Sequence, residues 1–134
     1  MNTERILLVD DSENDNLFHE ITIRKTGFAG DIRAFESAED FLQFLRQDEG
    51  GVPTLVLLDI NLPGMSGFDC ARQVDTLVGE DRSVFVSVLT SSTWRDDRYA
   101  ADAIAAIEDF LIKPLTREAL ERVMERARAK ACAG

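Results

Sequence analysis

Short apolar runs alternate with helical patterns along the whole chain. The runs that begin at Ile6, Leu55 and Val84 are almost continuously apolar, which is typical of strands buried on both faces of a sheet. A weaker strand is expected at 31–35 and a short one at 110–112. The chain therefore reads as five strands separated by other elements.

Each predicted strand is followed by a segment with the apolar spacing of a helix. The first helix runs from Ser12 to about Thr26, with Leu17, Phe18 and Ile21 on one face, and Gly27 is a natural stop after it. The second helix is capped by Ser37 and has Ala38, Phe41, Leu42 and Leu45 on its inner stripe. The third helix carries Cys70, Ala71, Val74 and Leu77. An alanine-rich helix over 94–105 and a last helix that starts at Thr116 complete the set.

This alternation of strands and helices predicts an α/β fold with helices on both faces of a parallel sheet. Right-handed crossovers leave a doubly wound arrangement as the natural topology. We expect a flavodoxin-like, five-stranded parallel sheet with the strand order 2-1-3-4-5. That order sets the strands that begin at Ile6 and Leu55 side by side, at the switch point of the sheet.

The length and composition indicate a single soluble domain. The chain has 134 residues, of which 45% are hydrophobic and 30% are charged. These values are ordinary for a globular protein and too apolar for a disordered chain. We expect one domain over 1–130, a short C-terminal tail over 131–134, and no output domain.

The charge and the absence of targeting patterns narrow the class of protein further. A formal net charge of −10 argues against nucleic-acid binding and against a basic membrane-surface protein. No apolar run approaches the ~18 residues of a membrane-spanning helix, and the N-terminus lacks the order of regions found in a signal peptide. Cys70 and Cys132 match no metal or redox spacing. We expect a cytoplasmic protein.

Polar, reactive side chains stand directly after four of the five predicted strands. They are Asp10 and Asp11, Asp59, Thr90 and Lys113. In doubly wound sheets, ligands bind outside the carboxyl ends of the strands at the switch point. These side chains therefore predict a site at one edge of the sheet.

The residue types at this edge indicate phosphoryl chemistry assisted by a divalent cation. Carboxylates that converge within a few ångströms repel one another by up to ~4 kcal/mol per pair, so some protonate or a cation joins them. Oxygen ligands without histidine or cysteine favour Mg²⁺. Lys113 and Thr90 suit phosphoryl oxygens, and a carboxylate such as Asp59 can be the nucleophile that forms an aspartyl phosphate.

Four segments, 6–11, 57–67, 90–92 and 110–114, carry ILLVDD, LLDINLPGMSG, TSS and FLIKP. In this order they resemble the receiver domain of two-component response regulators, and the resemblance covers the whole chain. It implies that Asp59 accepts a phosphoryl group from the phosphohistidine of a sensor kinase or phosphotransfer protein.

The resemblance also implies roles for the surrounding residues. Asp10 and Asp11 would hold Mg²⁺ together with Asp59 and the backbone carbonyl of Asn61. Lys113 would pair with the phosphoryl group. Thr90 would move toward that group, and Phe110 stands at the position of the family's aromatic switch residue.

The implied output is phosphorylation-dependent binding of a protein. The face would be built from the fourth helix, the fifth strand and the fifth helix. The partner would be a direct target or the next carrier of a phosphorelay. The protein itself would be a monomer or a homodimer favoured by phosphorylation.

Several positions depart from the family pattern or stay open. The family often has Gly-Ala where this chain has Ala106-Ile107, and Phe110 lacks the hydroxyl of the commoner tyrosine. The family's lysine–proline bond is cis, and the sequence leaves open whether the Lys113–Pro114 bond is. Trp94 is either a partner anchor or a packing residue. His19 is given no role.

Two other functions compete with a phosphorylated receiver. A phosphatase of the haloacid-dehalogenase type needs a second aspartate two residues after the nucleophile, where this chain has Asn61. A constitutive interaction module on a receiver fold would need none of the reactive side chains. A calcium-binding loop at 10–16 is rejected, because the required glycine and glutamate are missing.

Overall fold

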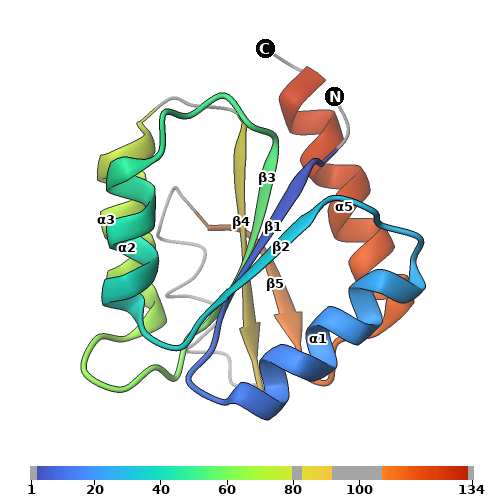
Figure 1. The fold of residues 1–134 in the computed structure, drawn as a ribbon, viewed down its shortest axis with the longest axis horizontal. Helices are drawn as coiled ribbons and strands as arrows, with labels where there is room; N and C mark the ends of the chain where they lie inside the picture. The colour runs from blue at the N-terminus through green and yellow to red at the C-terminus, as the bar shows by residue number, and fades with distance from the viewer. Residues whose placement is uncertain (1–2, 80–82, 92–106, 133–134) are drawn as a thin grey trace.

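A computed structural model describes residues 3–79, 83–91 and 107–132 of the chain. These residues form one parallel sheet with helices on both faces (Figure 1). Helices α2 and α3 cover one face, and α1 and α5 cover the other. The predicted fold class is confirmed.

The five strands are all parallel and are hydrogen-bonded in the order β2-β1-β3-β4-β5. Their bounds are β1 Arg5–Val9, β2 Asp31–Phe35, β3 Thr54–Asp59, β4 Val84–Thr90 and β5 Ile107–Ile112. Every residue of β1, β3 and β4 is buried, whereas β2 and β5 at the edges are partly exposed. The apolar runs of the sequence thus mark the interior of the sheet, as expected for strands covered on both faces.

The described helices are α1 Glu13–Lys25, α2 Ala38–Gln47, α3 Gly67–Val78 and α5 Arg117–Cys132. Each begins after a hydroxyl side chain that accepts a backbone N–H from the first turn: Ser12, Ser37, Ser66 and Thr116. Such caps satisfy N–H groups that lack a partner within the helix. The starts predicted at Ser37 and Thr116 therefore have a direct physical cause.

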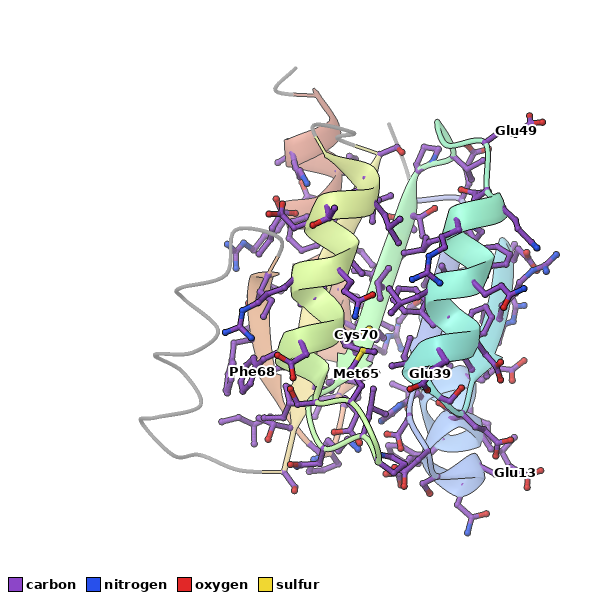
Figure 2. The ribbon with its side chains drawn as sticks, turned by 90° about the vertical axis from the view of Figure 1, so that its left-hand side faces the viewer. Glu13, Glu39, Glu49, Met65, Phe68 and Cys70 are labelled. Carbon is purple, nitrogen blue, oxygen red and sulfur yellow. The ribbon has the colours of Figure 1, made fainter. Side chains whose placement is uncertain are left out.

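Successive residues of β1 point to opposite sides of the sheet and divide the core in two. Leu7 and Val9 pack in the cluster beneath α2 and α3, while Ile6 and Leu8 pack in the cluster beneath α1 and α5. Cys70 belongs to the first cluster and lies on the sheet side of α3 (Figure 2). Burial raises the pKa of its thiol to about 12, which is typical of an unreactive packing residue.

Helix α1 corrects one feature of the sequence interpretation. Its apolar face, Leu17, Phe18 and Ile21, is 56%, 48% and 47% exposed. The buried residues are instead Asn16, His19, Thr22 and Ile23. Amphipathicity alone would instead turn the face with Leu17, Phe18 and Ile21 toward the sheet.

Hydrogen bonds at the start of α1 explain its rotation. The Ser12 N–H donates to Asp10 Oδ1 at 2.9 Å, and Asn16 Nδ2 donates to the carbonyl oxygen of Asp10 at 2.9 Å. These bonds tie the first turn to the end of β1, so a polar side of the helix faces inward there.

Two boundaries also differ from those expected. Strand β5 begins at Ile107, three residues before the predicted start at Phe110, and α5 continues to Cys132, into the segment expected as a tail over 131–134. The helix expected over 94–105, which includes Trp94, lies outside the described residues. Ser92 and Ala106 lie outside them as well. Among the described helices, none has the length and apolar character needed to cross a bilayer.

Candidate functional site

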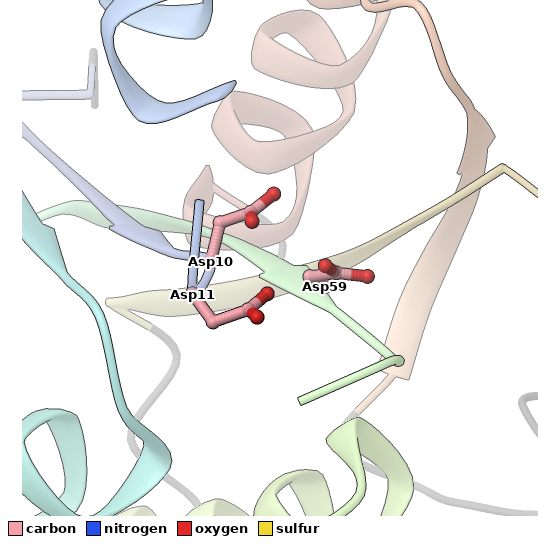
Figure 3. A group of neighbouring side chains, drawn as sticks. All are labelled: Asp10, Asp11 and Asp59. Carbon is pink, nitrogen blue, oxygen red and sulfur yellow. The ribbon is translucent and has the colours of Figure 1, made fainter. Parts of the chain in front are cut away.

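Three aspartates converge at the carboxyl ends of two neighbouring central strands (Figure 3). Asp10 and Asp11 follow β1, and Asp59 is the last residue of β3. One carboxylate oxygen from each lies within 4.8 Å of the others. Asp10 and Asp59 are buried and Asp11 is exposed, so the cluster opens to solvent on one side.

Backbone contacts hold Asp59 in this position. The Asn61 N–H donates to Asp59 Oδ1 at 3.0 Å, and the Gly67 N–H donates to the carbonyl oxygen of Ile60 at 3.0 Å. A Cβ at Gly67 would lie 2.5 Å from the carbonyl oxygen of Asp59, so only glycine lets α3 start this close to the strand end. Burial raises the pKa of the Asp59 carboxyl above its ordinary value, while the Asn61 N–H and the charge of Lys113 act in the opposite direction.

Lys113 reaches the same edge from the end of β5. Its backbone N–H donates to the carbonyl oxygen of Thr90 at 2.7 Å, and the Lys113–Pro114 bond is cis. The ammonium Nζ lies 2.7 Å from Asp10 Oδ2, 3.0 Å from Asp15 Oδ2 and 3.4 Å from Asp59 Oδ2. Burial lowers the pKa of Lys113, but the hydrogen bonds to Asp10 and Asp15 and the charges of Asp59 and Asp10 outweigh it and raise the pKa overall.

The remaining residues singled out in the sequence lie near this edge in different environments. Thr90 is fully buried at the end of β4, one position beyond the residue that pairs with Asp59. Phe110 is half-buried on β5, opposite Val88 of β4. Asn61 is exposed and contacts Asp59 through its backbone N–H.

Asp15 and His19 were not predicted to belong to this site. Asp15 lies in the first turn of α1 and binds Lys113, which is 98 residues away in the sequence. His19, one turn further along α1, is 3% exposed. Its pKa is lowered by burial and by the charge of Lys113, against the opposing charges of Asp10 and Asp15. The spacing of Ser12 and Asp15 is typical of a helix start, and it could have placed Asp15 in the first turn of α1, near the end of β1.

The donor set fits a hard divalent cation. Its carboxylates supply oxygen ligands, the type that Mg²⁺ prefers, and two of the three are held by backbone N–H groups. Asp10, Asp15 and Asp59 contact the ammonium of Lys113, and Asp11 adds a fourth carboxylate beside Asp10 and Asp59. Among the described residues, these four carboxylates are thus set against one lysine. This excess of negative charge favours a bound cation.

The comparisons with known proteins agree with this geometry. The sequence model of the response regulator receiver domain matches residues 6–125, which is most of the chain. The chain belongs to the response regulator receiver family. The receiver is thus a signalling module of two-component systems.

Individual relatives show the same likeness. The receiver is 35% identical over 123 residues to the "Probable methanogenesis regulatory protein FilR2" of Methanothrix harundinacea, covering 90% of this chain and 78% of that one. It is 30% identical over 116 residues to protein PilH of Pseudomonas aeruginosa, covering 87% of this chain and 90% of that one.

A crystal structure supports the fold assignment. A response regulator receiver protein from Dyadobacter fermentans superposes with a TM-score of 0.83 at 27% identity, covering 92% of this chain and 97% of that one. The flavodoxin-like topology expected from the sequence is therefore shared with solved receivers.

Proposed function

We propose that this receiver is switched by transfer of a phosphoryl group to Asp59. The observation that carries the proposal is the meeting of Asp59 with two further carboxylates and one ammonium at the carboxyl edge of the sheet. A carboxylate in such a setting can act as a nucleophile, and the surrounding groups can balance the charge of the product.

The transfer replaces one bond to phosphorus by another. A carboxylate oxygen of Asp59 attacks phosphorus and forms an acyl phosphate, while the bond from phosphorus to the donor's histidine nitrogen breaks. The electron pair of that bond stays on the imidazole. The donor would be a sensor histidine kinase or a phosphotransfer protein.

Asp10, Asp11 and Asp59, with the backbone carbonyl of Asn61, would hold Mg²⁺. Bound there, the cation offsets the negative charge of the phosphoryl oxygens. Asp10 is buried, with Oδ1 held by the Ser12 N–H and Oδ2 accepting a hydrogen bond from Lys113 at 2.7 Å. Lys113 supplies the second positive charge, 3.4 Å from Asp59.

The output would be a change in protein binding at a face that includes β5 and α5, with Thr90 and Phe110 as switch residues. Two ion pairs already couple these elements: Arg126 to Asp109 at 3.0 Å and Lys130 to Glu108 at 2.8 Å. A shift of β5 would therefore be passed to α5. We further propose a cytoplasmic location, a downstream protein target, and a monomer or a homodimer favoured by phosphorylation.

The test is to incubate the receiver with acetyl phosphate and Mg²⁺, and with a phosphorylated histidine kinase, and to follow the intact mass. We expect a mass gain that requires Mg²⁺ and is lost in Asp59→Asn. Asp69→Asn, an exposed acid of α3, is the matched control and should be phosphorylated like the native chain. Labelling that persists in Asp59→Asn, or none with either donor, would overturn the proposal.

A further inference from the structure

Lys113 is shared among carboxylates from three different elements. Its ammonium has three N–H donors, and three carboxylates lie within hydrogen-bond distance: Asp10 after β1, Asp15 on α1 and Asp59 on β3. The contact to Asp59 is the longest, at 3.4 Å, against 3.0 Å to Asp15 and 2.7 Å to Asp10. In this arrangement the lysine lies closer to α1 than to the proposed phosphoacceptor.

Asp15 differs from the other two partners of the lysine. It is outside the group of three carboxylates that could hold a cation, and its side chain is 47% exposed, against 3% for Asp10 and 7% for Asp59. It therefore binds the lysine without belonging to the cation cluster.

Hydrogen bonds at the start of α1 hold the backbone of Asp15 in place. The Asp15 N–H donates to Ser12 Oγ at 3.2 Å, and the Ser12 N–H donates to Asp10 Oδ1 at 2.9 Å. The backbone of Asp15 is thus linked to the end of β1 through a single residue, and from there its carboxylate reaches Lys113 at 3.0 Å.

We infer that Asp15 is a positioning residue that holds Lys113 back and competes with a phosphoryl group for its positive charge. The inference rests on the proposed function, in which Lys113 pairs with the phosphoryl group on Asp59. An added phosphoryl group carries about −1.5 to −2 charges, and its oxygens must draw the ammonium away from Asp15. Neutralising Asp15 removes this competitor and strengthens binding of a phosphoryl group at Asp59.

The equilibrium probe is beryllium trifluoride, whose beryllium becomes tetrahedral when a carboxylate oxygen binds it, so that the bound anion takes the place of a phosphoryl group. Its affinity in saturating Mg²⁺, measured by fluorine NMR, reports on Lys113 without a chemical step. We expect Asp15→Asn to bind it about two- to fivefold more tightly than the native chain, the range expected for a partly exposed charge pair.

Three controls separate a contact with Lys113 from a general effect of charge. Glu13→Gln removes the same charge from the same helical turn and should leave the affinity at the native value. Asp15→Glu keeps the carboxylate and should return the affinity toward the native value. The gain in Asp15→Asn should also persist at high salt, where repulsion between separated charges is screened.

The outcomes distinguish this inference from the proposed function. If the native chain binds beryllium trifluoride and Asp59→Asn does not, the proposed site stands. Equal affinities for Asp15→Asn and Glu13→Gln would then overturn the role of Asp15 alone. If the native chain shows no binding that depends on Asp59, the proposed function fails and the inference fails with it.

Discussion

At the carboxyl edge of the sheet, negatively charged side chains outnumber positively charged ones among the described residues. Among the described residues, three carboxylates contact the ammonium of Lys113 and a fourth, Asp11, lies beside two of them. Asp10 and Asp59 are almost fully buried. Each buried carboxylate loses hydration and gains repulsion from its neighbours. The site therefore costs folding free energy, and a cation would offset part of this cost.

Magnesium is expected to stabilise the receiver against unfolding. A ligand that binds only the native state at about one hundred times its dissociation constant adds about 2.7 kcal/mol. Thermal unfolding with Mg²⁺ and with a chelator measures the difference. In Asp11→Asn the gain should shrink strongly, because one of the three clustered carboxylates is neutralised.

The matched control is Asp75→Asn, which neutralises an exposed acid on α3 away from the cluster. It should keep the full gain from Mg²⁺. An equal loss of the gain in both variants would contradict a specific cation site and point to general screening of the acidic surface.

The ion pair between Arg5 and Asp48 predicts a pH-dependent contribution to stability. Arg5 is buried, and its guanidinium donates to both oxygens of Asp48, at 3.1 and 2.9 Å. These hydrogen bonds lower the pKa of the Asp48 carboxyl below its ordinary value of 3.8. Asp48→Asn should reduce the free energy of unfolding at neutral pH by about 1 kcal/mol.

Since the pKa of Asp48 is lower in the folded chain, its stabilising effect is complete above pH 3.8 and is lost as the pH falls through the folded pKa. Urea unfolding of both proteins from neutral pH downward should therefore show the difference between them vanish in acid. The other acids titrate in both proteins and cancel. A difference that stays constant below pH 3.8 would contradict the ion pair.

At the scale of elements, α1 shows that an apolar pattern does not by itself decide which face of a helix is buried. The spacing of Leu17, Phe18 and Ile21 marked one face, but that face is exposed. The hydrogen bond from Asn16 to the backbone of Asp10 sets the rotation, and a polar side chain is buried as a result. The apolar pattern in the sequence contains no information about this bond.

A pair of isoleucines in α1 tests this rotation. Ile23 is fully buried against the sheet, whereas Ile21 is 47% exposed. Ile23→Ala should reduce the free energy of unfolding by about 2–5 kcal/mol, because it leaves a cavity in the core. Ile21→Ala should change it by no more than about 0.5 kcal/mol. Chemical denaturation of both variants measures the contrast, and equal losses would show that the rotation is wrong.

Helix α2 was easier to predict because its cap and its apolar stripe agree, whereas in α3 one predicted stripe residue, Leu77, is 39% exposed. Ser37 caps α2, and the stripe of Ala38, Phe41, Leu42 and Leu45 is buried as expected. Sequence prediction of an element succeeds where local capping and burial point the same way, and both signals are present here.

At the scale of the whole molecule, the sheet order decides which strands are protected. Strand β3 is hydrogen-bonded to β1 and β4 and is covered on both faces, whereas β2 has one neighbour and exposed side chains. Native-state hydrogen exchange should be slowest for amides of β3 and much faster for those of β2. Similar rates in the two strands would contradict this difference in protection.

The sequence alone determined the parallel sheet, its strand order and the edge where polar side chains gather. Continuous apolar runs require strands covered on both faces, and parallel crossovers bring the carboxyl ends of those strands to one edge. The motifs at that edge were also enough to identify the family. These features are local in the chain or follow from general rules of topology.

Only the tertiary structure decided which groups share a charge or a hydrogen bond across that edge. Asp15 binds Lys113, which is 98 residues away in the sequence, and Arg5 binds Asp48, which is 43 residues away. Such contacts depend on strand register, on the rotation of α1 and on the direction of single side chains. None of these leaves a periodic trace in the sequence, because each is set by packing between segments that are distant along the chain.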